Sequence, residues 1–343
     1  MATGIVRALS ITSRRKSSQI MQAYQSKDGK FVRPDSTFRN FVSSDPKSQF
    51  PAEAGRYALY LSPSCPWAHR TLIARKLKGL ESAIDVYTFH PVMGPEGWYF
   101  SGEEGALAED PLHPGVTKIR QLYLKADPNY NGRFTVPLLW DKKTDQPVNN
   151  ESSEILRMLA LEFDAIVPEH LREAKQPNGG LYPEALRKDI DELNEWVYRD
   201  VNNGVYKVGF ASTQEAYNEN ITPLFAALDK LESRLSDGRK FLFGDGLTEA
   251  DVRLFTTLVR FDAAYHLVMQ CTLRSIRHDY PHLHLWLRRL YWDGGRFNGA
   301  FRETSLLDKY ALGYADSRRR IVLGNAPLIV PAVPKEEELI PKL

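Results

Sequence analysis

The chain is poor in cysteine: Cys65 and Cys271 are the only two in 343 residues. Neither has a second cysteine three positions further on, so no Cys-x-x-Cys pair is present. No spacing of cysteine and histidine is typical of a zinc site, and we expect no metal. A free thiol is most stable in a reducing compartment, so the cytoplasm is the expected location.

Long apolar runs and an excess of one charge are also missing. No run of 18 apolar residues occurs, so no membrane span is expected. The net charge is +2, which is too balanced to favour a nucleic-acid surface. Only residues 1–27 are one-sided, with five basic residues and no acidic one. That composition resembles a mitochondrial transit peptide, and a disordered basic N-terminus is the alternative.

The most informative stretch surrounds Cys65. A strand-like run, 56–61, precedes it, and apolar residues at helical spacing follow it. Pro66 suits a first helical position, where a missing N–H costs nothing. Cys65 is therefore expected at a helix N-terminus, where free N–H groups and the helix dipole should lower its pKa below the usual value of about 8.5. The alternative is an inert cysteine buried in a strand-to-helix turn.

Ala68 occupies the position where a second, resolving thiol would stand. A lone thiol cannot resolve its own mixed disulfide, so an external thiol has to do so. This pattern is typical of monothiol, glutathione-using members of the thioredoxin-fold superfamily. Residues 56–165 support that interpretation, because strands and helices follow in the order β-α-β-α-β-β-α. Val136-Pro137 opens one of these strands, and its peptide bond is a candidate for the cis form.

The second half of the chain is helical in period. Apolar residues recur at helical spacing in 184–201, 214–235, 248–267 and 281–291. Thr248 and Asp251 form a near capping box at the start of an apolar helix that should be central. We predict a thioredoxin-like α/β domain followed by an all-α domain. The predicted boundaries are an N-terminal arm (1–55), the α/β domain (56–165), a linker (166–182), the helical domain (183–310) and an extended tail (311–343).

Several longer motifs resemble one family in detail. They are Ser64 to Thr71, Met93 to Trp98, Tyr130 to Pro137, Asn149 to Ile155, Asn202 to Tyr206 and Leu247 to Phe261. Together they resemble the glutathionyl-hydroquinone reductases, the Xi class of glutathione transferases, over about residues 38–292. The resemblance implies glutathione as co-substrate, aromatic glutathione conjugates as substrates, no metal and a homodimer.

The resemblance also implies roles for individual residues. Cys65 would be the nucleophile, and Tyr206 and Tyr310 would be catalytic residues beside the aromatic group. The glutathione contacts would be Trp98, Arg133, Val136, Glu151 and Ser152. From the local sequence alone, Trp98 could instead anchor a long loop in the core. Glu151 and Ser152 could simply cap a helix.

Two regions depart from the family pattern. The family has histidines around its C-terminal tyrosine, and both are absent around Tyr310. A His and a basic residue are also missing before Cys271, where Val268 and Gln270 stand instead. Both departures lie on the side expected to hold the aromatic group. The competing functions are an omega-like thiol transferase or dehydroascorbate reductase, and a glutathione-transferase-fold protein that binds ligands without turnover.

Overall fold

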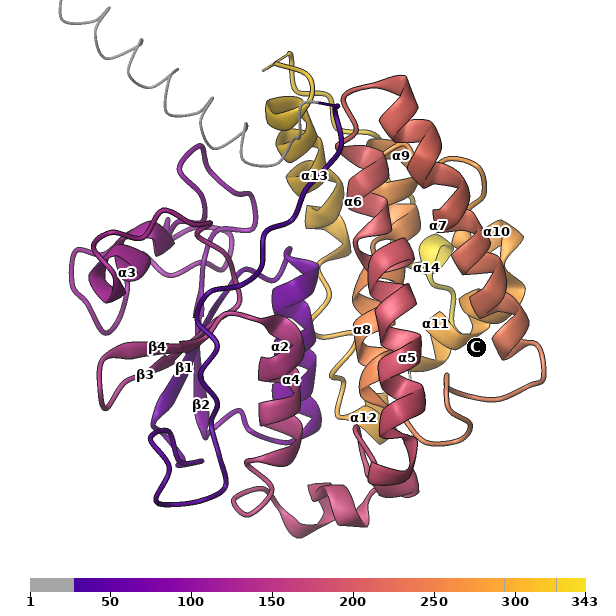
Figure 1. The fold of residues 1–343 in the computed structure, drawn as a ribbon. Coiled ribbons are helices and arrows are strands. Elements are labelled where there is room, and N and C mark those ends of the chain that lie inside the picture. The colour runs from indigo at the N-terminus through magenta and orange to yellow at the C-terminus, as the bar shows by residue number, and fades with distance from the viewer. Residues whose placement is uncertain (1–27, 293, 325) are drawn as a thin grey trace, which may run out of the picture.

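The computed structural model describes residues 28–343 except 293 and 325, so the candidate targeting segment, 1–27, lies outside the described residues. The first domain contains a four-stranded sheet in the order β2-β1-β3-β4 (Figure 1). The strands are β1 (Tyr57–Leu61), β2 (Ile84–Thr88), β3 (Leu138–Asp141) and β4 (Gln146–Asn149). β1 runs parallel to β2 and antiparallel to β3, which pairs antiparallel with β4. This is the expected thioredoxin-like arrangement.

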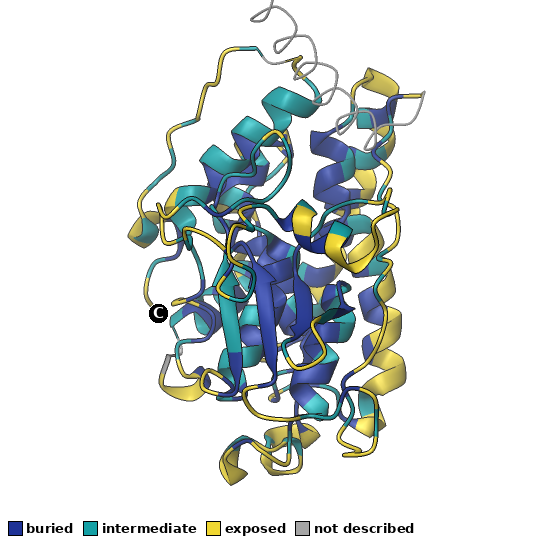
Figure 2. Ribbon diagram, turned by 90° about the vertical axis from the view of Figure 1, so that its left-hand side faces the viewer, coloured by how far each residue is buried: buried dark blue, intermediate teal, exposed yellow. Residues whose placement is uncertain are grey.

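The sheet is buried between helices. Every residue of the central strand β1 is buried, which fits its apolar sequence Tyr-Ala-Leu-Tyr-Leu (Figure 2). Helices α2 (Pro66–Leu77) and α4 (Ser152–Leu161) pack together on the face toward the second domain. Helix α3 (Ile119–Ala126) covers the other face (Figure 1). The helix that begins beside Cys65 therefore lies at the boundary between the two domains.

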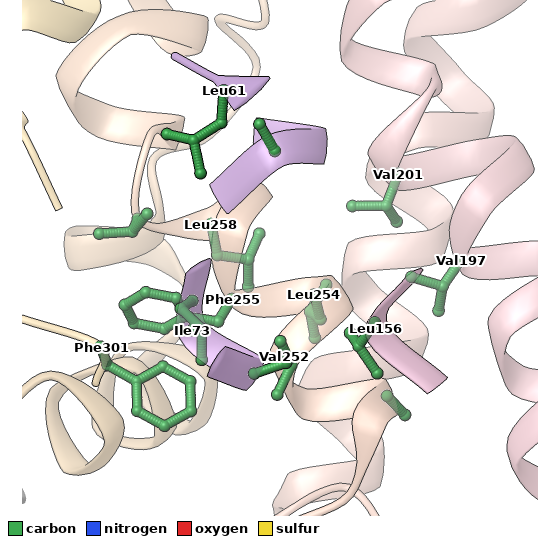
Figure 3. Close-up of a cluster of buried hydrophobic side chains, with 14 of the residues drawn as sticks. Leu61, Ile73, Leu156, Val197, Val201, Val252, Leu254, Phe255, Leu258 and Phe301 are labelled. Atoms are coloured by element: carbon green, nitrogen blue, oxygen red, sulfur yellow. The ribbon is translucent and has the colours of Figure 1, made fainter. Parts of the chain in front are cut away.

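The second domain is helical throughout the described residues. Its helices are α5 (Arg187–Val197), α6 (Gly204–Gly209), α7 (Gln214–Leu235), α8 (Glu249–Leu258), α9 (His266–Val268), α10 (Ile276–Asp279), α11 (Pro281–Trp292), α12 (Gly294–Phe297), α13 (Leu307–Ile321) and α14 (Glu336–Leu339). As predicted, Thr248 and Asp251 form a capping box and α8 is central. Figure 3 shows Val252, Leu254 and Phe255 of α8 in one apolar cluster with Ile73 of α2 and Leu156 of α4. This cluster joins the two domains.

The prediction of an extended tail from residue 311 is wrong in its first part. Helix α13 continues to Ile321, and it buries Tyr310, Ala311, Tyr314 and Ala315 on one face. The four prolines that suggested an extended chain all come later, at positions 327, 331, 334 and 341. The predicted helix over 248–267 is also interrupted, because α8 ends at Leu258 and a π-helical turn follows at Phe261–Tyr265.

The N-terminal arm connects the two domains. Near its start, the Gly29 carbonyl accepts a hydrogen bond from the backbone N–H of Ser212 in the helical domain. Further along, the N–H of Asn40 donates to the carbonyl of Val148 in β4, at the edge of the sheet. The arm therefore crosses the boundary between the domains (Figure 1). Within the described part of the chain, no helix is both long and apolar enough to cross a bilayer.

Candidate active site

One cleft at the domain boundary gathers all eight residues singled out from the sequence. Its lining includes Cys65, Trp98, Arg133, Val136, Glu151, Ser152, Tyr206 and Tyr310. They come from the α/β domain, from the long loop between β2 and α3 (89–118), and from the helical domain. Tyr310 is 245 positions from Cys65. The cleft contains about 1240 Å³ of empty space, including its open mouth.

Cys65 is the N-cap residue of α2, with Pro66 at the first helical position, as predicted. Its own N–H donates to the carbonyl of Ser62 at 3.0 Å, which closes the turn between β1 and α2. Its Sγ lies 3.7 Å from the carbonyl oxygen of Val136. The side chain is half-buried, and it lines the cleft. The sulfur is therefore placed to meet a ligand that pairs with the Val136 backbone.

The predicted lowering of the Cys65 pKa is wrong in this structure. Burial is the largest influence, and it raises the pKa of the Cys65 thiol above its ordinary value. The N–H groups of Ala68 and Trp67 act in the opposite direction, as the helix N-terminus argument requires, but they are weaker. The guanidinium groups of Arg260 and Arg33 also favour the thiolate. The sequence identified the helix N-terminus, but it could not show that burial would be the larger influence on the Cys65 pKa.

Arg260 supplies one of these charges from the second domain. It is fully buried, and it donates hydrogen bonds to the carbonyls of Ser64 at 3.2 Å and Pro63 at 3.0 Å, just before Cys65. It also bonds the carbonyl of Thr256 at 2.7 Å and lies beside Nδ1 of His69 at 3.0 Å. Among the described residues no carboxylate lies within ion-pair distance of it. Arg260 thus fixes the loop that carries Cys65 and places a buried positive charge near the sulfur.

The cis peptide bond considered for Val136-Pro137 is present. Val136 is nearly fully buried and presents its carbonyl toward Cys65. An extended peptide can pair with such a backbone edge through main-chain hydrogen bonds. Trp98 lines the same cleft and is partly buried against the core, so it also anchors the long loop.

Glu151 caps α4, so the capping interpretation is correct as far as it goes. Its carboxylate accepts hydrogen bonds from the N–H and hydroxyl of Ser153, and from the hydroxyl of Ser36 at 3.1 Å. Burial alone would raise its pKa, but these hydrogen bonds and the nearby Arg70 outweigh burial and lower the pKa. An ionised carboxylate at the cleft surface can also accept a ligand ammonium group.

The hydroxyl of Ser152 lies 3.4 Å from Nη1 of Arg70. Arg70 is buried and also donates to Oδ1 of Asn202 at 3.0 Å, which connects α2 to the helical domain. Ser152 therefore lies at the N-terminus of α4, next to the buried positive charge of Arg70. Such a place suits a ligand carboxylate.

Tyr206 and Tyr310, both predicted to act on the aromatic group, do not contact each other through their hydroxyls. Its hydroxyl lies 2.9 Å from that of Tyr314, which in turn lies 2.7 Å from the hydroxyl of Tyr265. The hydroxyl of Tyr310 instead accepts the N–H of Leu306 at 3.0 Å, and its ring lies under Arg260. Tyr310 and Tyr314 are one turn apart on α13. Tyr314, not Tyr310, is thus within hydrogen-bond distance of Tyr206.

Burial keeps the three connected hydroxyls protonated. It raises the pKa of Tyr206, and it raises those of Tyr314 and Tyr265 well above their ordinary value. Both Tyr206 and Tyr314 line the cleft, so a ligand there can meet a protonated tyrosine hydroxyl.

Sequence reasoning missed the contribution of the N-terminal arm. Phe31, Arg33 and Ser36 all line the cleft. Phe31 stacks on Tyr206 at 5.8 Å between ring centroids. The arm carries four phenylalanines between residues 31 and 50, a pattern typical of packing, but nothing local marks them for a site. In the described residues, no group of three or more potential metal ligands occurs.

The sequence of this chain is similar to those of glutathione S-transferases. The N-terminal domain model of glutathione S-transferase matches residues 64–162, and the C-terminal domain model matches 214–289. Glutathione S-transferase omega-like 2 of Schizosaccharomyces pombe is 48% identical over 307 residues, which cover 89% of this chain and 95% of that protein. Glutathionyl-hydroquinone reductase YqjG of Escherichia coli is 48% identical over 273 residues, covering 78% of this chain and 80% of that protein.

Solved structures agree with the sequence matches. Glutathione S-transferase Xi from Phanerochaete chrysosporium has a TM-score of 0.84 and 48% identity, and the match covers 93% of this chain and 96% of that one. The glutathione-bound structure of YqjG from Escherichia coli has a TM-score of 0.78 and 42% identity, with 89% and 95% covered. The chain therefore belongs to the glutathione S-transferase family, among its Xi-class members, as its motifs predicted.

Proposed function

We propose that the protein is a glutathione-dependent reductase that removes glutathione from glutathionyl-hydroquinones. The observation that carries this proposal is the cleft itself, in which Cys65 lies against the Val136-Pro137 edge and which the paired hydroxyls of Tyr206 and Tyr314 also line. The similarity to a relative named for this activity supports it. The similarity to a glutathione-bound structure supports glutathione as the co-substrate.

The reaction has two steps. In the first, the Cys65 thiolate attacks the sulfur of the conjugate, an S–S bond forms and the aryl C–S bond breaks. The electron pair of that bond goes to the ring carbon, which takes a proton and leaves as part of the hydroquinone. In the second, a glutathione thiolate attacks the mixed disulfide, which releases oxidised glutathione and the Cys65 thiolate. The ring is reduced and two glutathione molecules are oxidised.

The binding residues have complementary chemistry for the tripeptide. The backbone of Val136 pairs with the cysteinyl residue of glutathione. Glu151 accepts the γ-glutamyl ammonium group, while Ser152 and the N-terminus of α4 hold the adjacent carboxylate. Arg133 offers a cation for a further carboxylate, and Trp98 offers a flat apolar surface. These assignments place the conjugate's sulfur beside Cys65.

The departing ring carbon needs a proton, and the protonated tyrosine hydroxyls that line the cleft can supply it. We assign this role to Tyr206 with Tyr314, in place of the Tyr206 and Tyr310 pair expected from the sequence. Tyr314 bonds Tyr206 directly, so it can hold the Tyr206 hydroxyl in position and refill its proton from Tyr265. Arg260 acts as a positioning residue, because it holds the peptide carbonyls before Cys65.

The activity itself is tested by incubating the protein with a glutathionyl-hydroquinone and glutathione. We expect free hydroquinone and oxidised glutathione in equal amounts. Intact-mass spectrometry of the reaction without added glutathione should show one glutathione attached at Cys65. Release of neither product, with the conjugate still bound, would favour a binding protein without turnover.

The proton-donor assignment predicts a selective defect. Tyr206→Phe and Tyr314→Phe should each slow release of the aromatic product by about 100-fold or more, since general acid catalysis typically contributes about 10²–10⁴-fold. Formation of a mixed disulfide with a small glutathione disulfide should change little, because no ring carbon is protonated in that reaction. Single-turnover kinetics measures both steps. Tyr310→Phe is the matched control, because its hydroxyl contacts the Leu306 backbone instead. Equal slowing of both reactions would remove Tyr206 and Tyr314 from this role.

The small-disulfide reaction is also the activity of the alternative, an omega-like thiol transferase, which the name of the Schizosaccharomyces pombe relative brings into consideration. Cys65 without a resolving cysteine serves either chemistry. The tyrosine pair favours the hydroquinone reaction, because a disulfide exchange needs no donor to carbon. The homodimer, aromatic conjugates other than hydroquinones, and the cytoplasmic or mitochondrial location stay predictions from the sequence.

A further inference from the structure

Arg33 is a cation at the cleft, and most of its N–H donors are not used by any described residue. Its Nε donates to Oδ1 of Asn203 at 2.9 Å, which fixes the guanidinium against the helical domain. Neither terminal amino group has a hydrogen-bond partner among the described residues. A guanidinium has five N–H donors in a fixed planar arrangement, so four of them are left for a ligand or solvent.

The surroundings of Arg33 are aromatic rather than acidic. Its guanidinium carbon lies 4.7 Å from the ring centroid of Trp67, 4.8 Å from that of Tyr206 and 5.2 Å from that of Phe31. Asp35 and Glu151 line the same cleft, but neither lies within ion-pair distance of Arg33. The carboxylate of Glu151 is occupied by Ser36 and Ser153. The cation is therefore held in place without a counter-ion from the described part of the chain.

Arg39, on the same arm, is a useful comparison because its guanidinium is engaged in a structural ion pair. Its guanidinium makes a two-point ion pair with the carboxylate of Glu154, with Nε 2.7 Å from Oε2. It does not line the cleft. Both arginines attach the arm to a folded domain, but only Arg33 has its terminal donors open at the cleft.

We propose that Arg33 binds an anionic oxygen on the aromatic half of the conjugate and selects for substrates whose ring carries one. This inference rests on the proposed function. The neighbours of Arg33 indicate which half of the ligand it meets: the Tyr206 ring belongs to the side assigned to the aromatic group, and Phe31 stacks on it. Trp67, the third ring, is two residues from Cys65, where the two halves of the conjugate join. Trp98, Arg133 and Val136, assigned to glutathione, belong to the α/β domain and its long loop. The planar, charged guanidinium of Arg33 matches a carboxylate best, because its two terminal amino groups can bind both oxygens. We therefore expect a carboxylate on the ring, next to the hydroquinone oxygens.

The test compares two S-aryl glutathiones that differ only in charge, one with a ring carboxylate and one with the matching carboxamide. Binding is measured by calorimetry in a Cys65→Ser background, so that no ligand is consumed. We expect the carboxylate to bind about tenfold more tightly than the carboxamide, as a charge-assisted hydrogen bond allows. Arg33→Met should abolish this preference, and Arg33→Lys should retain part of it. Arg39→Met should keep the full preference, although it too removes a charge from the arm.

Each outcome has a definite meaning. An unchanged preference in Arg33→Met overturns the inference. So does an equal loss of affinity for glutathione alone, because the anion would then belong to the tripeptide. A role limited to holding the arm would weaken both ligands equally and leave their ratio unchanged, which also overturns it. Because binding is measured without turnover, the two tests can fail separately. If the reductase assay fails in the wild-type protein, the proposed function is overturned, but the binding result for Arg33 can still be interpreted.

Discussion

Replacing Cys65 with serine should abolish hydroquinone release, with a fall in rate of at least about 10³-fold. A serine hydroxyl remains protonated at neutral pH and cannot form the S–S bond on which the two-step reaction depends. The change replaces only the sulfur atom by oxygen and leaves the residues assigned to glutathione unchanged. Affinity for glutathione should therefore stay close to that of the wild-type protein. The measurement is hydroquinone release together with calorimetric binding of glutathione.

Cys271→Ser is the matched control for this prediction. Cys271 is fully buried, its thiol donates weakly to the carbonyl of Met269 at 3.7 Å, and burial raises its pKa. It does not line the cleft. The variant should therefore keep its turnover. Loss of turnover in both variants, or in neither, would contradict the role given to Cys65.

Asp251→Ala should be the most destabilising single change at the start of α8. The carboxylate is fully buried, and it accepts from the N–H and hydroxyl of Thr248, at 3.0 and 2.9 Å. It also accepts from the N–H of Leu242 and from Nε1 of Trp286, both at 2.9 Å. Alanine would leave four buried donors without their acceptor. We expect the free energy of unfolding to fall by about 3–5 kcal/mol.

For a chain of this length, that loss corresponds to a decrease of about 4–7 °C in melting temperature. Thermal unfolding followed by circular dichroism measures it. Asp237→Ala is the control, since Asp237 is an exposed partner of Arg239 and its loss should leave the melting temperature nearly unchanged. Equal melting temperatures for Asp251→Ala and the wild-type protein would show that these hydrogen bonds contribute little.

The sequence was most informative where function depends on neighbours along the chain. Pro66 directly follows Cys65, so the helix N-terminus could be located from the sequence alone. The cis bond before Pro137 and the capping box of Thr248 and Asp251 are likewise local features, and the structure contains both. In each case the interacting groups lie within a few residues, and local stereochemistry limits the possible arrangements.

The sequence was least informative where the outcome depends on how the domains pack. The hydroxyl that meets Tyr206 belongs to Tyr314, 108 positions away, and no local signal distinguishes it from Tyr310 one turn earlier. The arm contributes Arg33 only because the folded chain brings it against Asn203, 170 positions later.

The amino-acid sequence by itself determined the two-domain fold and which residues to propose as the nucleophile and the tripeptide contacts, because motifs and periodicity are local properties. Only the tertiary structure decided that Tyr314, not Tyr310, contacts the Tyr206 hydroxyl and that a buried Arg260 supports the Cys65 loop. It also decided that burial of the sulfur outweighs the helix N-terminus in setting the pKa of Cys65. These properties depend on distances and enclosure between segments far apart in the chain, which are fixed only when the two domains pack together.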